Sequence, residues 1–396
     1  MGALDDVRVL ELGTLLAGPF TGRLLGDFGA EVIKIEPPDR EDPMRRWGQQ
    51  VNGEGLLWPT QSRNKKCITL NLRVPEGQDV FLELVRTADV VLENFRPGTM
   101  EKWGLGYDVL KQVNPRIIML RTSGFGQTGP YSSQAGFGSV GEAMGGIRYV
   151  TGYPDRPPTR IGISVGDSLA AVYATLGCLA ALHEREKSGL GQIVDTAIYE
   201  AVFAMMEGLV TEYDSTGYIR ERTGNILPGV APANIYATSD GGFIVMGANA
   251  DTVFARLAIA MGRPELSEDE RFRTHTARGN NMKELDDMIT AWTQNYPTDR
   301  LLEILAENGV PSGKIYNAED IIEDPHYAAR NMILSMSHPT LGPIKIPGIV
   351  PKLSRTPGEV RWLGPIRMGE HNEEVFAKLL GYSEEKMEQL QQIGVI

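Results

Sequence analysis

Cysteine and histidine are both scarce in this sequence. The 396 residues include two cysteines and five histidines, and no C-x-x-C pair occurs. Cys67 and Cys178 therefore indicate neither a disulfide framework nor a zinc site. Such sparing use of thiols is typical of a reducing compartment, so we expect a cytoplasmic protein that binds no metal.

An excess of positive charge is also absent. The 39 Lys and Arg residues are outnumbered by 51 Asp and Glu residues, which gives a formal net charge of −12. Because the nucleic-acid backbone attracts basic proteins, we expect no nucleic-acid partner. Several cations nevertheless lie in the first quarter of the chain and could hold a small polyanion: Arg45, Arg46, Arg63, Lys65, Lys66 and Arg96.

No segment resembles an export signal or a membrane span. The first residues, MGALDDVRVLELG, lack the basic and then apolar order of a secretory signal. The most apolar stretch, LAAVYATLGCLAAL, is about 14 residues long, whereas a membrane span needs roughly 20. We therefore expect this stretch to be a buried core helix and the protein to have no membrane partner.

Strand and helix patterns alternate through the first third of the chain. The expected strands are VRVLEL, EVIKIE, CITLNL, DVVLEN and RIIMLRTS, with a helical pattern between most of them. The loop after the first strand, GTLLAGP, lacks the G-x-G-x-x-G pattern of a dinucleotide site, although Glu36 ends the second strand. The alternation predicts an α/β fold with a mainly parallel, Rossmann-like sheet covered by helices.

The rest of the chain suggests a second, smaller domain. Residues 122–166 are rich in glycine, and helices are expected at about 168–187 and 192–208. NIYATSDGGFIVMGA is typical of a β-hairpin, and helical stretches follow it near 251–262, 280–295 and 298–308. We predict a large α/β domain over 1–200, a linker over 201–225, a small α+β domain over 226–310, a linker over 311–339, and a C-terminal segment over 340–396 that returns to the large domain.

The segment RIGISVGDSLAA contains two candidate nucleophiles. GISVG fits the G-x-S-x-G pattern of serine hydrolases, but the residues before Ser164 are too rich in proline for a central strand, and no HGGG-like stretch occurs. Asp167 directly precedes an apolar helical pattern. An aspartate there is either a helix N-cap or a carboxylate oriented for attack on a carbonyl, and the residues alone leave both interpretations open.

Several motifs along the chain together resemble one known family. They are VLELGTLLAGPFTGRLLGDFGAEVIKIEPP, RNKKCITLNL, ENFRPG, TSGFGQTGPY, GDSLAA, GVPSGKI, KLSRTP, MGEH and LGY, in this order. The sequence is similar to the class III coenzyme A (CoA) transferases, which include formyl-CoA and carnitine CoA-transferases, and to the related α-methylacyl-CoA racemases. Racemases use a histidine in the loop before the aspartate, where this chain has Phe137. The resemblance therefore favours the transferases, with a racemase as the alternative.

The resemblance also implies site residues and substrates. It assigns the nucleophile to Asp167, which would attack an acyl-CoA and form mixed-anhydride and aspartyl-CoA intermediates with a small carboxylic acid as the second substrate. The donor is expected to be succinyl-CoA, and the acceptor a C4–C6 dicarboxylate such as malate, citramalate, itaconate, mesaconate or glutarate. It further implies an interlocked homodimer.

The residues that the resemblance assigns to substrates fall into two groups. The expected CoA contacts are Leu15, Leu16, Ala17, Lys65, Asn94, Phe95, Arg96 and Lys102. The expected contacts to the acid or to a covering loop are Arg45, Arg46, Arg160, Gly247, Ala248 and Asn249.

Overall fold

The protein is described by a computed structural model that covers residues 2–396. It divides into two compact units, each built from segments that are distant in sequence. The chain up to Arg148, Ile161–Thr216 and Ala329–Ile396 form unit 1, and Tyr149–Arg160 and Gly217–Ala328 form unit 2. The domain boundaries predicted from the sequence stay a prediction, because a domain is a segment that folds independently and the two compact units are defined by contacts alone.

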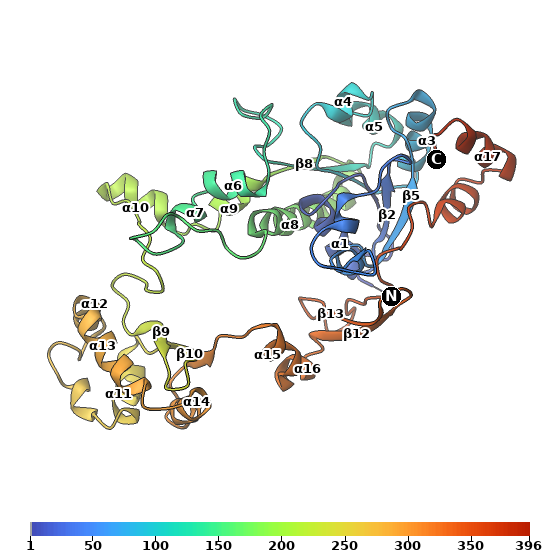
Figure 1. The fold of residues 1–396 in the computed structure, drawn as a ribbon. Helices are drawn as coiled ribbons and strands as arrows, with labels where there is room; N and C mark the ends of the chain where they lie inside the picture. Colours follow the sequence, from blue (N-terminus) through green and yellow to red (C-terminus); the bar gives the residue numbers. More distant parts are fainter. Residues whose placement is uncertain (1) are drawn as a thin grey trace. The chain divides into compact units, whose positions relative to one another are not determined.

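A six-stranded parallel sheet forms the centre of unit 1 (Figure 1). Its strand order is β5-β2-β1-β6-β7-β8, and every neighbouring pair is parallel. The predicted α/β class with a mainly parallel sheet is confirmed. The strands are β1 (Arg8–Glu11), β2 (Glu31–Glu36), β5 (Lys65–Thr69), β6 (Val90–Glu93), β7 (Ile118–Ser123) and β8 (Ile193–Ala197).

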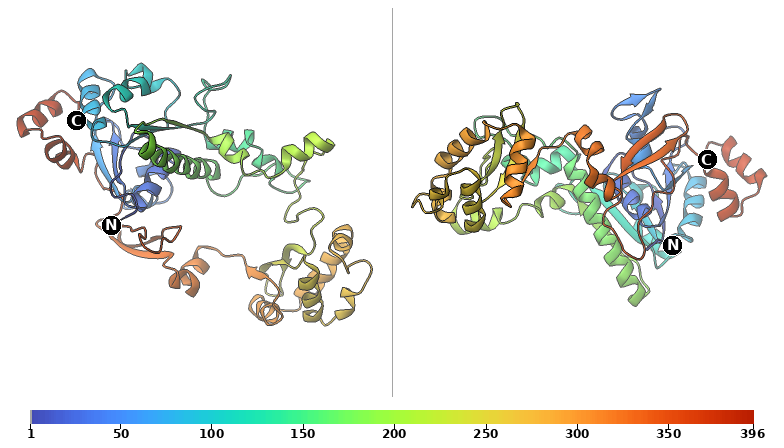
Figure 2. Two further views of the ribbon diagram at one scale, coloured as in Figure 1. Left: turned by 180° about the vertical axis from the view of Figure 1, so that it is seen from behind. Right: turned by 90° about the horizontal axis from the view of Figure 1, so that it is seen from below.

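Helices cover both faces of this sheet, because successive strand residues point to opposite sides. Leu10 and Ile33 pack with α3, α5 and α17 on one face. Val9 and Val32 pack with α1 and α8 on the other, and α8 lies along that face (Figure 2). These helices are α1 (Ala17–Asp27), α3 (Pro75–Val85), α5 (Tyr107–Val113), α8 (Val165–Ser188) and α17 (Glu384–Gln392).

The middle of the chain confirms one predicted helix and contradicts another. The helix expected at about 168–187 is present as α8, which begins at Val165. The helix expected over 192–208 is instead strand β8 followed by α9 (Ile198–Phe203), with α10 (Leu209–Thr216) after it. The other elements of unit 1 are η1 (Pro43–Arg46), β3 (Gln50–Val51), β4 (Glu54–Gly55), α2 (Trp58–Gln61), α4 (Thr99–Lys102), α6 (Gly138–Met144), β12 (Ile333–His338), β13 (Gly342–Pro347) and the π-helix Glu373–Leu379; α7 (Ile147–Val150) leads into unit 2.

The free edge of β5 is covered by the C-terminal segment. Cys67 and His371 exchange two hydrogen bonds, and the Trp362 indole donates to the Lys65 carbonyl over 2.9 Å. The Thr69 amide donates to the Asn372 side chain over 2.9 Å. The C-terminal segment therefore returns to the large sheet and closes one of its edges.

Unit 2 contains the predicted hairpin. β9 (Ala233–Ala237) and β10 (Phe243–Gly247) pair antiparallel around the SDGG turn, which confirms the prediction, and β11 (Ser312–Lys314) joins β10. Tyr236 and Ile244 pack with the surrounding helices in a separate hydrophobic core. The helices of this unit are α11 (Asp251–Ala260), η2 (Pro264–Ser267), α12 (His275–Asn280), α13 (Met282–Thr293), α14 (Thr298–Glu307) and α15 (Ala318–Glu323), and α16 (Pro325–Ala329) follows at its boundary with unit 1.

Helix α8 has two different faces. Among residues 2–396 it is the one helix that is long and apolar enough to cross a membrane, with a mean hydropathy of 1.6 in its most apolar window. Its buried face packs into the core of unit 1 through Ala174, Cys178 and Ala181, as predicted for a core helix. Leu176 on the other face is 61% exposed.

Candidate active site

Asp167 lies in the first turn of α8. Ser164 occupies the N-cap position, so the interpretation of Asp167 as the N-cap is wrong. α8 leads into β8, which runs parallel to β7, so its first turn must lie at the carboxyl edge of the sheet. Helix α1 begins at the same edge, and Thr21 in α1 contacts the Ala171 carbonyl in α8. The first turn of a helix is a favourable place for a carboxylate.

The carboxylate of Asp167 is half-buried against a glycine. A β-carbon at Gly138 would lie 2.2 Å from Asp167 Oδ2, so any side chain at this position of α6 would displace the carboxylate. Among the described residues, no donor is hydrogen-bonded to the Asp167 carboxylate. Burial, together with the negative charge of Glu142, raises the pKa of Asp167 to about 6. The carboxylate is thus available for reaction rather than tied into a structural contact.

Glu142 is the acidic neighbour of Asp167 and is almost fully buried. Its Oε2 accepts hydrogen bonds from Arg148 Nη2 at 2.7 Å and Nε at 3.1 Å. Its Oε1 accepts from the Gly166 amide at 3.3 Å. The sequence analysis did not identify Glu142, because a single glutamate in a glycine-rich stretch carries no recognisable pattern.

Ser164 does not have the setting of a hydrolase nucleophile. Its carbonyl accepts the Ser168 amide and hydroxyl, as expected at a helix start. A nucleophile elbow requires a strand that runs directly into the serine, and residues 151–164 contain no strand. The G-x-S-x-G match therefore results from a glycine-rich loop that enters a helix.

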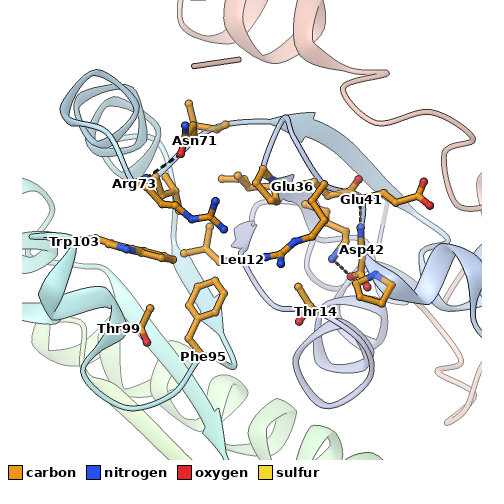
Figure 3. A pocket seen from close by; sticks show the side chains of 17 residues that line it. Leu12, Thr14, Glu36, Glu41, Asp42, Asn71, Arg73, Phe95, Thr99 and Trp103 are labelled. Carbon is orange, nitrogen blue, oxygen red and sulfur yellow. Dashed lines mark hydrogen bonds and ion pairs between the residues drawn. The ribbon is translucent and has the colours of Figure 1, made fainter. Parts of the chain in front are cut away.

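A cavity of about 390 Å³ opens beside the ends of β1, β2, β5 and β6 (Figure 3). Phe95 and Trp103 line one side, with ring centroids 5.3 Å apart in an edge-to-face arrangement. The exposed side chain of Arg73 extends into the cavity, and Arg40 also lines it. The cavity therefore combines aromatic rings with exposed cations at the edge where α/β folds bind ligands.

The loop after β1 is held above this cavity by side chains from three other elements. The Asn94 amide group bonds the Thr14 N–H and carbonyl, both at 2.9 Å. Asp42 accepts the Leu15 amide, and Lys34 donates to the Gly13 carbonyl at 2.8 Å. Leu15 has a φ of 64°, a left-handed conformation that is uncommon for a leucine. The loop is fixed by these bonds in a conformation that it would not adopt alone.

The residues predicted to contact CoA are distributed unevenly around this cavity. Phe95 lines it, while Asn94 fixes the loop that contains Leu15, Leu16 and Ala17. Arg96 and Lys102 are exposed nearby but do not line it. Lys65 is fully buried: its ammonium binds Glu11 and the Pro19 carbonyl, so a nucleotide could reach it only if that ion pair opened.

Sequence reasoning missed Arg40, Arg73 and Trp103. Arg40 and Arg73 each follow a sheet strand by the same short interval, β2 ending at Glu36 and β5 at Thr69. A cation just beyond the carboxyl end of a parallel strand was the signal that could have identified them.

The residues predicted to contact the acid lie in both units. In unit 1, Arg45 is buried and binds Glu36 at 2.6 Å, while Arg46 is exposed and binds Glu41. Neither guanidinium is without a carboxylate partner here.

In unit 2, Arg160 ends the segment Tyr149–Arg160, and Gly247, Ala248 and Asn249 follow the hairpin. The fully buried Arg278 donates to the Asn249 carbonyl at 2.6 Å and to the Asp251 carboxylate at 2.6 Å. This turn is thus anchored in unit 2, and its role as a covering loop stays a prediction.

No group of three or more possible metal ligands occurs among residues 2–396. This edge of the sheet offers a half-buried carboxylate, backbone N–H groups at a helix start, and a cavity with aromatic and cationic walls.

The chain matches known proteins over nearly its full length. The profile of CoA-transferase family III covers residues 4–372. A succinyl-CoA–D-citramalate CoA-transferase from Chloroflexus aurantiacus is 61% identical over 99% of this chain and 98% of its own. The β subunit of a succinyl-CoA–L-malate CoA-transferase from the same organism is 41% identical over 99% and 98%. A crystal structure of a CAIB/BAIF family protein from Brucella suis superposes with a TM-score of 0.85, is 34% identical, and covers 96% of this chain and 99% of that one.

Proposed function

Because this chain belongs to CoA-transferase family III and is a class III CoA-transferase, we propose that it moves CoA from succinyl-CoA to a C4–C6 dicarboxylic acid through covalent catalysis by Asp167. The two Chloroflexus aurantiacus relatives named above use citramalate and malate, by their names. Both acids are 2-hydroxy dicarboxylates, so citramalate and malate are the first acceptors to test. Itaconate, mesaconate and glutarate are the next.

The first half of the reaction loads CoA onto the enzyme. An Asp167 carboxylate oxygen attacks the thioester carbonyl carbon, the C–S bond breaks, and CoA leaves as the thiolate. The product is a mixed anhydride between Asp167 and succinate. The thiolate then attacks the aspartyl carbonyl of this anhydride, which releases succinate and leaves Asp167 as a CoA thioester.

The second half reverses these steps with the acceptor. A carboxylate of the acceptor attacks the aspartyl thioester and expels CoA thiolate, which forms a second anhydride. The thiolate attacks the acceptor carbonyl, so acyl-CoA leaves and the Asp167 carboxylate is restored. Each step exchanges one activated acyl group for another, and no net proton, oxidant or metal is required.

The first turn of α8 is suited to this sequence of steps. Asp167 must be ionised to attack, and the helix N-terminus stabilises a carboxylate while the backbone N–H groups there can donate to an oxyanion. Gly138 leaves no side chain above the carboxylate. Water has to be kept from the anhydride, because hydrolysis would waste the thioester.

The cavity beside β1, β2, β5 and β6 is our proposed site for the nucleotide end of CoA. Arg40 and Arg73 carry exposed positive charge suited to phosphate groups, and Phe95 and Trp103 offer rings for contact with adenine. Lys102, Arg96 and the loop that contains Leu15, Leu16 and Ala17 stay predicted contacts. Arg160 stays a predicted contact of the distal carboxylate of the acid.

We also propose that the enzyme is a cytoplasmic homodimer. Large apolar side chains are exposed along α8 and from the end of α9 to the start of α10: Val172, Leu176, Leu179, Phe203, Met205 and Val210. Large apolar side chains exposed in such number favour association with another protein surface. Sedimentation velocity tests this, and a stable, active monomer at assay concentration would contradict it.

The observation that carries the proposal is the half-buried Asp167 carboxylate, which lies at a helix start without a hydrogen-bonding partner among the described residues. Replacing Asp167 with Ala should lower CoA transfer by at least about 10³-fold while the unfolding transition stays cooperative. Hydroxylamine added during turnover with succinyl-CoA should convert Asp167 to a hydroxamate, which peptide mass spectrometry detects. Ser164→Ala is the matched control and should keep the wild-type rate.

Two results would contradict this function. Transfer retained in the Asp167→Ala variant would remove the proposed nucleophile. Release of free CoA in the absence of an acceptor, lost in Ser164→Ala, would indicate a hydrolase.

A further inference from the structure

Glu142 has no role in the steps above, yet it is nearly as buried as the core strands, with 2% exposure. We propose that Glu142 is a positioning residue for the nucleophile: it holds the first turn of α8 against α6 and keeps a negative charge beside Asp167, which favours the acylated enzyme over the free carboxylate. This inference rests on the proposed function of Asp167.

The packing between α6 and α8 places Glu142 next to the nucleophile. Gly138 and Glu142 are one helical turn apart, so they share a face of α6. Asp167 contacts the Gly138 end of this face, and the adjacent Gly166 contacts the Glu142 end. A β-carbon at Gly166 would lie 3.0 Å from Glu142 Cγ and 3.2 Å from the Gly138 carbonyl oxygen. The two glycines thus allow the two carboxylates to approach each other.

The two carboxylate oxygens of Glu142 accept hydrogen bonds from two different neighbours. Both hydrogen bonds from Arg148 reach Oε2, whereas Oε1 accepts the Gly166 amide. Arg148 therefore pairs with one oxygen of Glu142, and the other accepts only a neutral amide from the first turn of α8. The carboxylate charge is shared by both oxygens, and Arg148 does not cancel its repulsion of Asp167.

Other charged groups on the elements packed against α8 have partners elsewhere. On α9, Glu200 is exposed and accepts the Tyr199 hydroxyl. On α1, Arg23 bonds Gln61 and Asp27 pairs with Arg63. On β7, Arg121 pairs with Glu93 and Glu101. On β8, Asp195 accepts the Gln127 amide. Glu142, moderated by Arg148, is therefore the main charge acting on Asp167.

The negative charge of Glu142 beside Asp167 shifts the equilibrium between the free carboxylate and the acylated enzyme. Ionised Asp167 repels Glu142, and this repulsion disappears when Asp167 becomes a neutral anhydride or thioester. The free carboxylate is destabilised while the intermediates are not. Since a more basic carboxylate is also a better nucleophile, Glu142 promotes both attack and accumulation of the acyl-enzyme.

The test uses two variants with opposite expected effects. Glu142→Gln keeps an oxygen for the Gly166 amide and removes the charge, so the pKa of Asp167 should fall by about one unit. The acid limb of the pH dependence of kcat/KM should move to lower pH by the same amount. The fraction of enzyme trapped by hydroxylamine at steady state should fall about tenfold. Arg148→Met should move the acid limb to higher pH, and Glu200→Gln should leave it in place.

A measurement without substrate separates this inference from the proposed function. ¹³C NMR of aspartate-labelled protein, with the Asp167 signal identified from its loss in Asp167→Asn, gives the pKa of Asp167 in the free enzyme. An unchanged pKa in Glu142→Gln, or shifts of the same sign in both variants, would overturn the inference while the nucleophile stands. If Asp167→Ala keeps its activity, the proposed function fails although the NMR shift can still be observed.

Discussion

Two groups of buried carboxylates in unit 1 differ in whether their charge is neutralised. Beneath the loop after β1, Lys34 lies 3.2 Å from Glu11 and 2.7 Å from Asp42, and Lys65 lies 2.8 Å from Glu11. Beside α8, Arg148 pairs with Glu142, and among the described residues no cation pairs with Asp167. Both groups lie at the carboxyl edge of the same sheet.

The two groups have opposite effects on carboxylate ionisation. Burial opposes ionisation of Asp42, but the charge of Lys34 and the hydrogen bonds from Lys34 and from the Met44 and Leu15 amides together outweigh it, so the pKa of Asp42 lies below its ordinary value. Burial also opposes ionisation of Asp167, and Glu142 adds to the effect, so its pKa rises. Neutralised carboxylates stabilise the loop, whereas a carboxylate left without neutralisation is free to react.

The largest effect on this difference is expected from removing Lys34, the cation that Glu11 and Asp42 share. Lys34→Met leaves Glu11 with only Lys65 and Asp42 without an ion pair, so the free energy of unfolding should fall by about 3–5 kcal/mol. Urea unfolding followed by circular dichroism measures this loss. Arg46→Met removes an exposed pair with Glu41 and should cost less than about 1 kcal/mol. Equal losses in the two variants would show that burial does not matter here.

A methyl group at Gly138 disturbs the reactive group without changing any charge. Because a β-carbon would lie 2.2 Å from Asp167 Oδ2, Gly138→Ala should displace the carboxylate and lower kcat by about 10²-fold. Ser139→Ala, at an exposed position of the same helix, should keep the wild-type kcat. A wild-type kcat in Gly138→Ala would mean that Asp167 reacts from another position.

Removing the charge of Asp167 should stabilise the protein while it inactivates the enzyme. A carboxylate whose folded pKa is raised opposes folding above that pKa, and the cost disappears below its unfolded pKa. Asp167→Asn should therefore raise the free energy of unfolding by about 1–2 kcal/mol at pH 7.5, with no gain below about pH 4. Thermal unfolding at both pH values measures this, with Glu200→Gln as the control. A gain that persists at low pH would point to packing instead of charge.

The smallest expected effect concerns Arg73, an exposed cation of the proposed CoA site. Arg73 has only a 3.6 Å contact with the exposed Asp39. Arg73→Ala should raise the KM for succinyl-CoA by about 3–10-fold with kcat unchanged, and added salt should reduce the difference. Arg86→Ala, an exposed cation outside the cavity, serves as the control. An unchanged KM would place the CoA phosphates elsewhere.

The sequence predicted local features better than distant pairings. The alternation of strands and helices and the SDGG hairpin follow from short-range patterns, and both are present. Strand β8 was missed because its residues, IVDTA, are partly exposed and continue directly into α9. The start of α8 was placed a few residues too late because GIS and VG are typical of a loop, and the Ser164 side chain makes no capping hydrogen bond.

The candidate site was predictable only in part. Asp167 stands out through the motif around it, but Glu142 and Arg148 belong to a glycine-rich stretch whose short helices, α6 and α7, have no clear periodicity. Lys65 looked like a surface cation beside Lys66. Its burial depends on Glu11, a partner from another strand that no local pattern reveals.

The seam between β5 and the C-terminal segment has a consequence for synthesis on the ribosome. His371 bonds Cys67 across 304 residues of sequence. At a synthesis rate of about 5–20 residues per second, the C-terminal segment that covers the edge of β5 is made roughly 15–60 s after β5 itself. During that time an unpaired strand edge is exposed to other nascent chains. Chaperone capture of stalled chains that end before residue 362 should therefore exceed capture of full-length chains.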